Sequence, residues 1–347
     1  MTPRILSVVV CALLGLGAAS SQAGLTPDGW GGRVGYGHDS NVLSSSQGER
    51  DAFDSGASGY WFQVDRLEDW RANLELWGEW KVKTFAKGMK AELGYRRSQY
   101  AHLPILRSDR FDLSLKQKLT KIDVLSLALT YEPQVYLRHR LDKDAPPGAP
   151  LFRPESYRGI GVEVAYARPT LAGRTTTVFS SFESQDESRW FNERDRKRVG
   201  VGASMVVPFG PWSFTPSYEF AGAASRNEPD LGSDFGYREH VVGLRTRLTL
   251  GGGTAELPTR SWVLGIDGRA KLRGFTTDNP DDTSRYQRDD VSYSFSGRLL
   301  WRRGALSPFI GAEYAGRNIT LPAGADGSDE EGEYEDGAIG LGLEWEY

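Results

Sequence analysis

Cysteine is almost absent from this chain of 347 residues, which contains only Cys11. That residue lies in a stretch that we interpret as a secretory signal over residues 1–23. Arg4 supplies the positive region, residues 5–19 the apolar region, and Ser21-Gln22-Ala23 a cleavage site. The alternative is an N-terminal membrane anchor, and the shortness of the apolar run argues against it. The remaining chain has no cysteine, which excludes disulfides and thiol chemistry.

Long apolar runs are also missing. After residue 25 no segment approaches the roughly 20 apolar residues that a membrane helix needs. The mean hydropathy is −0.46, yet 12% of the residues are aromatic. The net charge of −4 implies no nucleic-acid partner.

Motifs for metals and nucleotides are not found either. His102, His139 and His240 are scattered and lack ligand spacing such as His-Glu-x-x-His. No glycine-rich phosphate loop follows a strand and opens a helix. We therefore expect no metal, no cofactor and no enzymatic activity.

Strict alternation of apolar and polar residues is what the chain has instead. In the segment 262–274, one parity carries Trp262, Leu264, Ile266, Ala270 and Leu272, and the other carries Asp267, Arg269, Lys271 and Arg273. Successive side chains of a strand point to opposite faces, so each such segment has one apolar and one polar face. About a dozen segments show this pattern, each near the 9–11 residues of a tilted membrane strand.

The connections between these segments alternate in length. Short ones lie near residues 86–88, 121–123, 169–173, 209–211 and 303–305, whereas long polar ones lie between them. Short periplasmic turns and long extracellular loops are typical of outer-membrane barrels. The pattern predicts 14 antiparallel strands. Residues 55–69 are read as an extension of the second strand or part of a long first loop, and an extra hairpin there would give 16 strands.

The last segment, residues 335–347, carries the resemblance to a known family. Ile339, Leu341 and Leu343 share one parity with the terminal aromatics. The segment resembles the final strand of bacterial outer-membrane β-barrels, in which a glycine precedes two spaced aromatic or apolar residues. Gly342, Trp345 and Tyr347 match that pattern. The resemblance implies an all-β, porin-like, up-and-down transmembrane barrel over residues 24–347, located in the bacterial outer membrane. It also implies outer-membrane lipids and lipopolysaccharide as surroundings, and recognition of the final strand by the barrel assembly machinery.

A secreted β-sandwich or lectin-like domain is the soluble alternative. It would need a second apolar layer to cover the outward leucines and aromatics. The polar faces carry too many charges for that.

Charged residues on the inward parity are the candidate functional residues. The acidic ones, expected on the first two and last two strands, are Glu75, Glu79, Glu313, Glu344 and Glu346. The basic ones, expected roughly across the barrel, are Arg245, Arg247, Arg269, Lys271, Arg273 and Arg298. Either they create a transverse field in a water-filled pore, or they form a salt-bridged network that fills a narrow barrel. A 14-stranded barrel lies between filled and open types, so size leaves both readings open.

The sequence His38-Asp39-Ser40-Asn41 ends the first predicted strand. His38 and Ser40 share a face, and His-x-Ser-Asn is similar to the motif of outer-membrane phospholipase A, with the histidine as base and the serine as nucleophile. Asp39-Ser40-Asn41-Val42 also resembles the first strand of the barrel module of surface lipoprotein assembly modifiers, where it forms a turn. The Tyr-Thr and Gly that flank the phospholipase motif are missing here, so we favour the turn.

Acidic residues cluster in the loop Asp326 to Asp336 and at Asp278, Asp281 and Asp282. Divalent cations bound there could bridge lipopolysaccharide phosphates. The spacing is not that of an EF-hand, so we expect solvated loops. The overall prediction is a passive channel for small polar or charged solutes. The alternatives are a lipid hydrolase using His38 and Ser40, or an export or assembly barrel for a protein or polymer.

Overall fold

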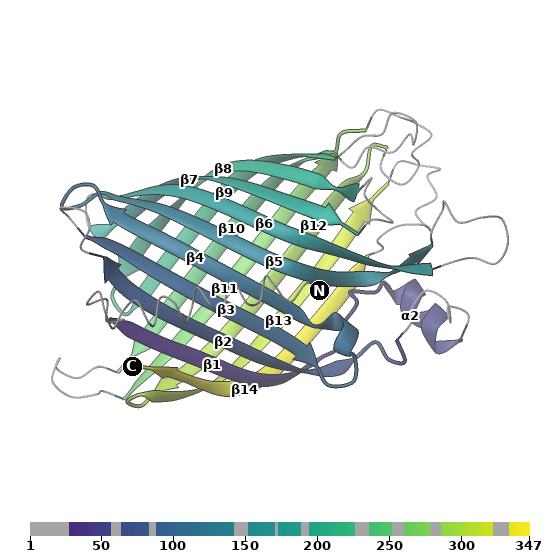
Figure 1. The fold of residues 1–347 in the computed structure, drawn as a ribbon, viewed down its shortest axis with the longest axis horizontal. Helices are drawn as coiled ribbons and strands as arrows, with labels where there is room; N and C mark the ends of the chain where they lie inside the picture. The colour runs from purple at the N-terminus through teal and green to yellow at the C-terminus, as the bar shows by residue number, and fades with distance from the viewer. Residues whose placement is uncertain are drawn as a thin grey trace.

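The chain forms a closed antiparallel barrel of 14 strands in this computed structural model (Figure 1). The structure describes residues 28–56, 64–82, 88–141, 152–170, 173–188, 194–225, 236–251, 260–277, 286–321 and 333–347. The strands are β1 (Gly29–Asp39), β2 (Asp69–Val82), β3 (Met89–Tyr100), β4 (Ser108–Lys118), β5 (Val124–Leu141), β6 (Phe152–Pro169), β7 (Thr175–Glu187), β8 (Arg196–Phe209), β9 (Trp212–Ser225), β10 (Tyr237–Leu250), β11 (Ser261–Phe275), β12 (Asp289–Arg302), β13 (Leu306–Thr320) and β14 (Tyr334–Glu346). Each strand pairs with its neighbours in sequence, and β14 closes on β1. The predicted signal, residues 1–23, lies outside the described residues.

The predicted count of 14 strands is confirmed, and the 16-strand alternative is wrong. In the described part of the connection between β1 and β2 there is helix α2 (Gln47–Asp54) and no further strand. Ser46 and Glu49 form a capping box that starts this helix. A second short helix, the 3-10 turn η1 (Pro104–Leu106), lies between β3 and β4. No helix in the described chain is long and apolar enough to cross a membrane.

The two ends of the barrel differ as the connection lengths predict. Figure 1 shows α2 at one end and the C-terminus at the other, beside the short turns. The end with α2 is therefore the extracellular one, and the end with the turns is periplasmic.

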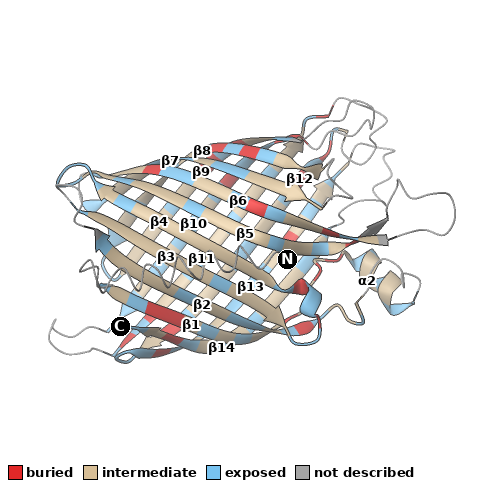
Figure 2. Cartoon of the chain, in the orientation of Figure 1, coloured by how far each residue is buried: buried red, intermediate tan, exposed pale blue. Residues whose placement is uncertain are grey.

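The outer face of the wall is an apolar surface. Leu341, Val201 and Phe295 are 66%, 57% and 55% exposed. Figure 2 shows that most of the wall is intermediate or exposed, as a single sheet without a packed second layer must be. The soluble sandwich is therefore excluded. An apolar exterior around a polar interior is the surface of a membrane-spanning barrel of the outer-membrane type.

Strand β5 departs from simple alternation. Its register to β6 shifts between Glu132 and Val135, and again between Tyr136 and Arg138. The first bulge adds one residue and reverses the parity, and the second restores it, so strict alternation, which would place Val135 on the outer face with Leu125 and Leu129, fails at Val135. Val135 pairs with Tyr157 and lines the interior. The physical reason is Pro133, which cannot donate to the ladder and favours a bulge.

Candidate functional site

The predicted inward residues do share the interior face. The register pairs Glu75 with Arg33 and Glu344 with Arg33, and it pairs Arg245 with Asp267, Arg269 with Ser294 and Glu313 with Ser296. The remaining members, Glu79, Glu346, Arg247, Lys271, Arg273 and Arg298, have the same parity on these strands. All eleven face the lumen, opposite in parity to the exposed apolar residues.

The expected separation of acids and bases across the barrel is wrong. The basic residues lie on β10, β11 and β12, and β12 is only two strands from β14. The Nη1 atom of Arg298 lies 3.5 Å from Oε2 of Glu344. The acidic set is therefore a neighbour of the basic set.

An alternating chain of charges follows the wall over half of the circumference. Its members, in order from β12 through the seam to β5, are Arg298, Glu344, Arg33, Glu75, Arg96, Asp112, Arg110 and Glu132. Successive charged atoms are 2.5 to 3.9 Å apart. Successive members of this chain carry opposite charges, so the charges neutralise one another along the wall.

Arg33 is the centre of this chain, and sequence reasoning missed it. Its Nη1 donates to Glu75 at 2.5 Å, and its Nε and Nη2 donate to Glu344 at 3.0 and 2.6 Å. Its guanidinium also lies over the rings of Trp77 and Phe309. The alternation of Trp30, Val34 and Tyr36 around it is the signal that could have found it.

A second network joins β7 to β11. Arg198 is only 6% exposed and contacts Glu183, Glu219 and Glu239. Arg273 bonds Glu239 at 2.9 Å. A buried guanidinium with several carboxylates satisfies charges that would otherwise be costly to bury. Sequence parity places these residues on the inner face but cannot show that they meet.

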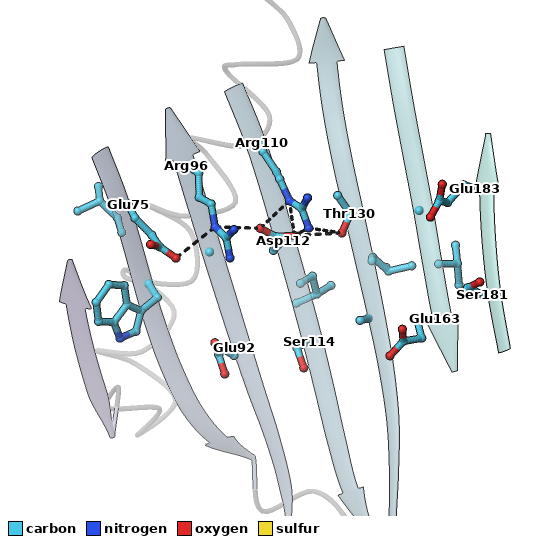
Figure 3. Close-up of a pocket in the computed structure, with 18 of the residues that line it drawn as sticks. Glu75, Glu92, Arg96, Arg110, Asp112, Ser114, Thr130, Glu163, Ser181 and Glu183 are labelled. Atoms are coloured by element: carbon cyan, nitrogen blue, oxygen red, sulfur yellow. Dashed lines mark hydrogen bonds and ion pairs between the residues drawn. The ribbon is translucent and has the colours of Figure 1, made fainter. Parts of the chain in front are cut away.

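The two networks do not join at β6. The first ends at Glu132 of β5 and the second at Glu183 of β7, with Gly159 and Gly161 on the strand between them. Figure 3 shows Glu163 and Glu183 beyond the last dashed contact. Glu183 contacts Arg198 at 3.5 Å, whereas Glu163 has no ion pair among the described residues, so Glu163 is the unneutralised acid of this stretch of wall.

Unpaired cations lie on the other side of the lumen. In the described part of the chain, neither Arg247 nor Lys271 has a carboxylate within 4.0 Å. Arg245 pairs with Asp267, but its side chain is 72% exposed. Strand β11 lies seven positions from β4 in a ring of 14, so the basic wall faces the alternating chain on β3 to β5, in which acids and bases cancel. Glu163 of β6 is the neighbouring acid for which the described residues show no ion pair.

The interior is hollow. Cavities of about 490, 710 and 760 Å³ lie in it and share lining residues. Glu163 lines the same cavity as Arg245 and Arg269. Ion pairs between the described strands join strands at most three positions apart, as Arg71 of β2 does with Glu313 of β13. Pairing along the wall, and not across the lumen, favours the water-filled pore over the filled barrel.

A cap covers part of the extracellular mouth. We define the cap as residues 40–54 and 103–106, which include η1. Its core is Leu43, Leu103 and Leu106, all less than 10% exposed. Glu49 of α2 binds Arg138 of β5 at 3.1 Å, and Asn41 donates to the carbonyl of Glu335 on β14. Among the described residues, the cap therefore lies against β14 and β1 to β5.

The motif at residues 38–41 forms a turn at the edge of the cap. Ser40 Oγ accepts the Gly337 N–H at 3.0 Å, and Asn41 Nδ2 donates to the carbonyls of Ser45 and Glu335. His38 lies edge-on to Trp70, on the outer face, and its Nε2 is 3.9 Å from Glu68. These contacts are those of the turn interpretation, with the polar side chains binding backbone groups.

The residues of the final strand lie at the seam of the barrel. Tyr347 stacks on Trp30 of β1 with ring centroids 4.8 Å apart. At Gly342 a Cβ would come within 2.1 Å of the Val34 carbonyl and 2.6 Å of the Phe309 ring, so only glycine fits. Trp345 points outward like Tyr347. Recognition by the assembly machinery stays a prediction.

The acidic loop was predicted mostly on residues that lie outside the described part, as were Asp278, Asp281 and Asp282. Glu333, Glu335 and Asp336 are described, and Glu333 accepts a hydrogen bond from the Ile319 N–H. Within the described residues there is no group of three or more metal-ligating side chains. The predicted divalent-cation sites stay untested.

Comparison with known proteins finds barrels of the same general kind. No family model and no curated protein matches the chain. Among solved structures, the outer-membrane channel DcaP of Acinetobacter baumannii is 11% identical, with a TM-score of 0.47 over 94% of this chain and 98% of that one. An anion-selective porin from Comamonas acidovorans is 9% identical, with a TM-score of 0.39 over 93% and 100%. At these values the likeness carries no argument about the solute.

Proposed function

We propose that the protein is a passive outer-membrane channel for small polar or charged solutes, with a preference for anions. The observation that carries this is the excess of lumen-facing cations on β10 to β12, of which Arg247 and Lys271 have no carboxylate within 4.0 Å in the described part of the chain. The charges of the alternating chain pair along the wall and cancel one another. The surplus positive charge on β10 to β12 therefore sets the local potential on its side of the lumen.

The route follows from the cap and the charge map. The cap lies above β1 to β5, where the alternating chain follows the wall. Beside the half of the barrel that carries the cap lies the cavity with Arg245 and Arg269 on one wall and Glu163 on the other. A solute there meets opposite fields on its two sides, and a dipolar solute is oriented by them.

Planar-bilayer recording tests the proposal. Purified protein in a salt gradient is expected to give stepwise conductance and a reversal potential on the anion-selective side. The double variant Arg247→Gln, Lys271→Gln is expected to move the reversal potential toward cation selectivity. The reason is that Glu163 and its neighbours then dominate the lumen.

The matched control is Lys121→Gln, which removes one cation from a periplasmic turn. It is expected to leave the reversal potential nearly unchanged. No current above background would refute the channel. Equal shifts in control and double variant would refute the assignment of selectivity to β10 and β11.

A further inference from the structure

The cavity of about 710 Å³ lies beneath the cap and adjoins the cavity of about 760 Å³, with which it shares Arg71, Asp267 and Glu313. Its volume lies within the range of about 300–1,000 Å³ that small-molecule sites occupy. Its lining comes from β1 to β5, from β11 to β14 and from the cap. Two groups among its lining side chains are relevant to a ligand. Apolar ones lie at the extracellular side, and the guanidinium of Arg96 lies deeper in the barrel.

The extracellular side of this cavity is an apolar ceiling. Val42 and Leu106 of the cap, with Val135 on the bulge of β5, supply aliphatic surface. Tyr100 and Tyr136 supply ring faces. Their hydroxyls are already bound, that of Tyr100 to Asp39 and that of Tyr136 to His139, each at 2.6 Å. The ceiling therefore offers apolar contact and no free tyrosine hydroxyl to a ligand.

The deeper side presents a guanidinium with unused donors. Arg96 contacts Glu75 and Asp112 only through Nε, at 3.1 and 3.8 Å, and its side chain is 55% exposed. Figure 3 shows its two terminal nitrogens without a dashed contact. Arg33, by contrast, uses all three nitrogens on carboxylates. Arg96, like Arg298 with its single 3.5 Å contact to Glu344, is thus a cation of the alternating chain that can bind a further anion.

The spacing of these two surfaces limits the ligand. Arg96 and Tyr100 are four residues apart on one strand, which is about 13 Å of backbone. Both line the same cavity. A ligand that contacts both needs an anionic end and an apolar body of several carbons.

We propose that this cavity binds a small amphipathic carboxylate, either an aromatic or a medium-chain one. The carboxylate pairs with the terminal nitrogens of Arg96 in the bidentate geometry that guanidinium favours. The apolar body lies against Val42, Leu106 and Val135 and leaves water. An organic cation is repelled by the guanidinium, and a polyol finds too few free partners at the ceiling.

Calorimetric titration of the purified full-length barrel in detergent tests the site. The probes are 3-phenylpropionate, acetate and phenethylamine. Phenylpropionate is expected to bind at least about tenfold more tightly than acetate, because only it reaches the ceiling. Phenethylamine is expected not to bind. Arg96→Gln is expected to weaken phenylpropionate about tenfold or more, as loss of a charged hydrogen bond does.

Two further variants separate the two surfaces. Val135→Ser is expected to weaken phenylpropionate several-fold and to leave acetate unchanged, because it alters only the ceiling. Lys121→Gln is the matched control, since it removes a cation from a periplasmic turn that does not line this cavity, and its affinity is expected to stay that of the parent.

Equal affinity for acetate and phenylpropionate would overturn the proposal, as would an unchanged affinity in Arg96→Gln or an equal loss in Lys121→Gln. Gel mobility before and after heating shows whether each variant is a folded barrel. If Arg96→Gln does not fold, Arg96→Lys takes its place, and an unchanged affinity there together with an unchanged affinity in Val135→Ser overturns the site. Ion conductance without this binding would remove the site and leave the channel intact.

Discussion

Arg33 has each of its guanidinium nitrogens on a carboxylate, and one of those carboxylates, Glu344, is only 7% exposed. In the variant Arg33→Gln, the contact that remains to Glu344 among the described residues is the long one to Arg298. We expect Arg33→Gln to lower the free energy of unfolding by about 1–3 kcal/mol, because a buried charge loses its partner. Urea unfolding in detergent micelles, followed by tryptophan fluorescence, measures it.

The matched control for that variant is Arg245→Gln. Arg245 also pairs with one strand neighbour, but its side chain is 72% exposed. Exposed pairs contribute about 0–1 kcal/mol. If the two variants lose the same stability, burial is not what makes Arg33 important.

Asp123, in the turn between β4 and β5, has its pKa lowered from the ordinary 3.8. The main cause is the hydrogen bond from Thr120 Oγ1 at 2.7 Å, followed by that from Tyr166. Because the folded pKa is depressed, the stabilisation by this contact is present above the ordinary pKa and is lost as pH falls through the lower value. Thr120→Val is expected to raise the pKa of Asp123 toward 3.8, as a carboxyl NMR titration would report. An unchanged pKa would contradict the assigned cause.

At the scale of elements, α2 depends on Glu49 twice. One carboxylate oxygen accepts the Ser46 N–H and the other accepts from Arg138. Glutamine keeps the capping bond but removes the ion pair, whereas alanine removes both. Opening of α2 should therefore increase in the order wild type, Glu49→Gln, Glu49→Ala. The alanine variant should open about fivefold more readily, for a loss of ~1 kcal/mol.

Hydrogen exchange of the amides of residues 47–54 measures that opening. Gln47→Ala, on the exposed side of the same helix, is the control and should change little. Equal protection in the wild type, Glu49→Gln and Glu49→Ala would show that neither the capping bond nor the ion pair holds the cap.

Strand β5 shows where alternation stops being a guide. The rule of opposite faces assigns Leu125, Leu127 and Leu129 correctly, because regular pairing preserves parity. It fails between Pro133 and Tyr136, because the first inserted residue reverses the parity and the second restores it. A proline inside an otherwise alternating strand is the signal in the sequence, but the second bulge near Tyr136 has no such signal.

At the scale of the whole molecule, parity and connection length were enough to predict the closed barrel and its 14 strands. Both are local patterns that repeat along the chain. The same patterns place Glu75 and Arg298 on the inner face. They could not predict that Arg298 reaches Glu344, because that contact depends on side-chain length and on the stagger of the barrel. The cap was missed for a similar reason, since its core joins Leu43 to Leu103 and Leu106 across 60 residues of sequence.

The uneven mouth makes a prediction for the whole barrel, and the absence of cysteine from the described chain makes it testable. A single thiol introduced into the lumen is the only one that a charged thiosulfonate reagent can modify there. Ser294→Cys on β12 lines the cavity of about 760 Å³, beside the capped half. Ser114→Cys on β4 lies below the capped half. Reagent added from the extracellular side should modify the first about tenfold faster, which corresponds to an access barrier of ~1.4 kcal/mol.

Deleting residues 42–54 should remove most of the difference, because the cap causes it. The decline of bilayer current after reagent addition gives both rates. Similar rates in the intact barrel would mean that the cap does not restrict entry, and solutes would then have both halves of the lumen available.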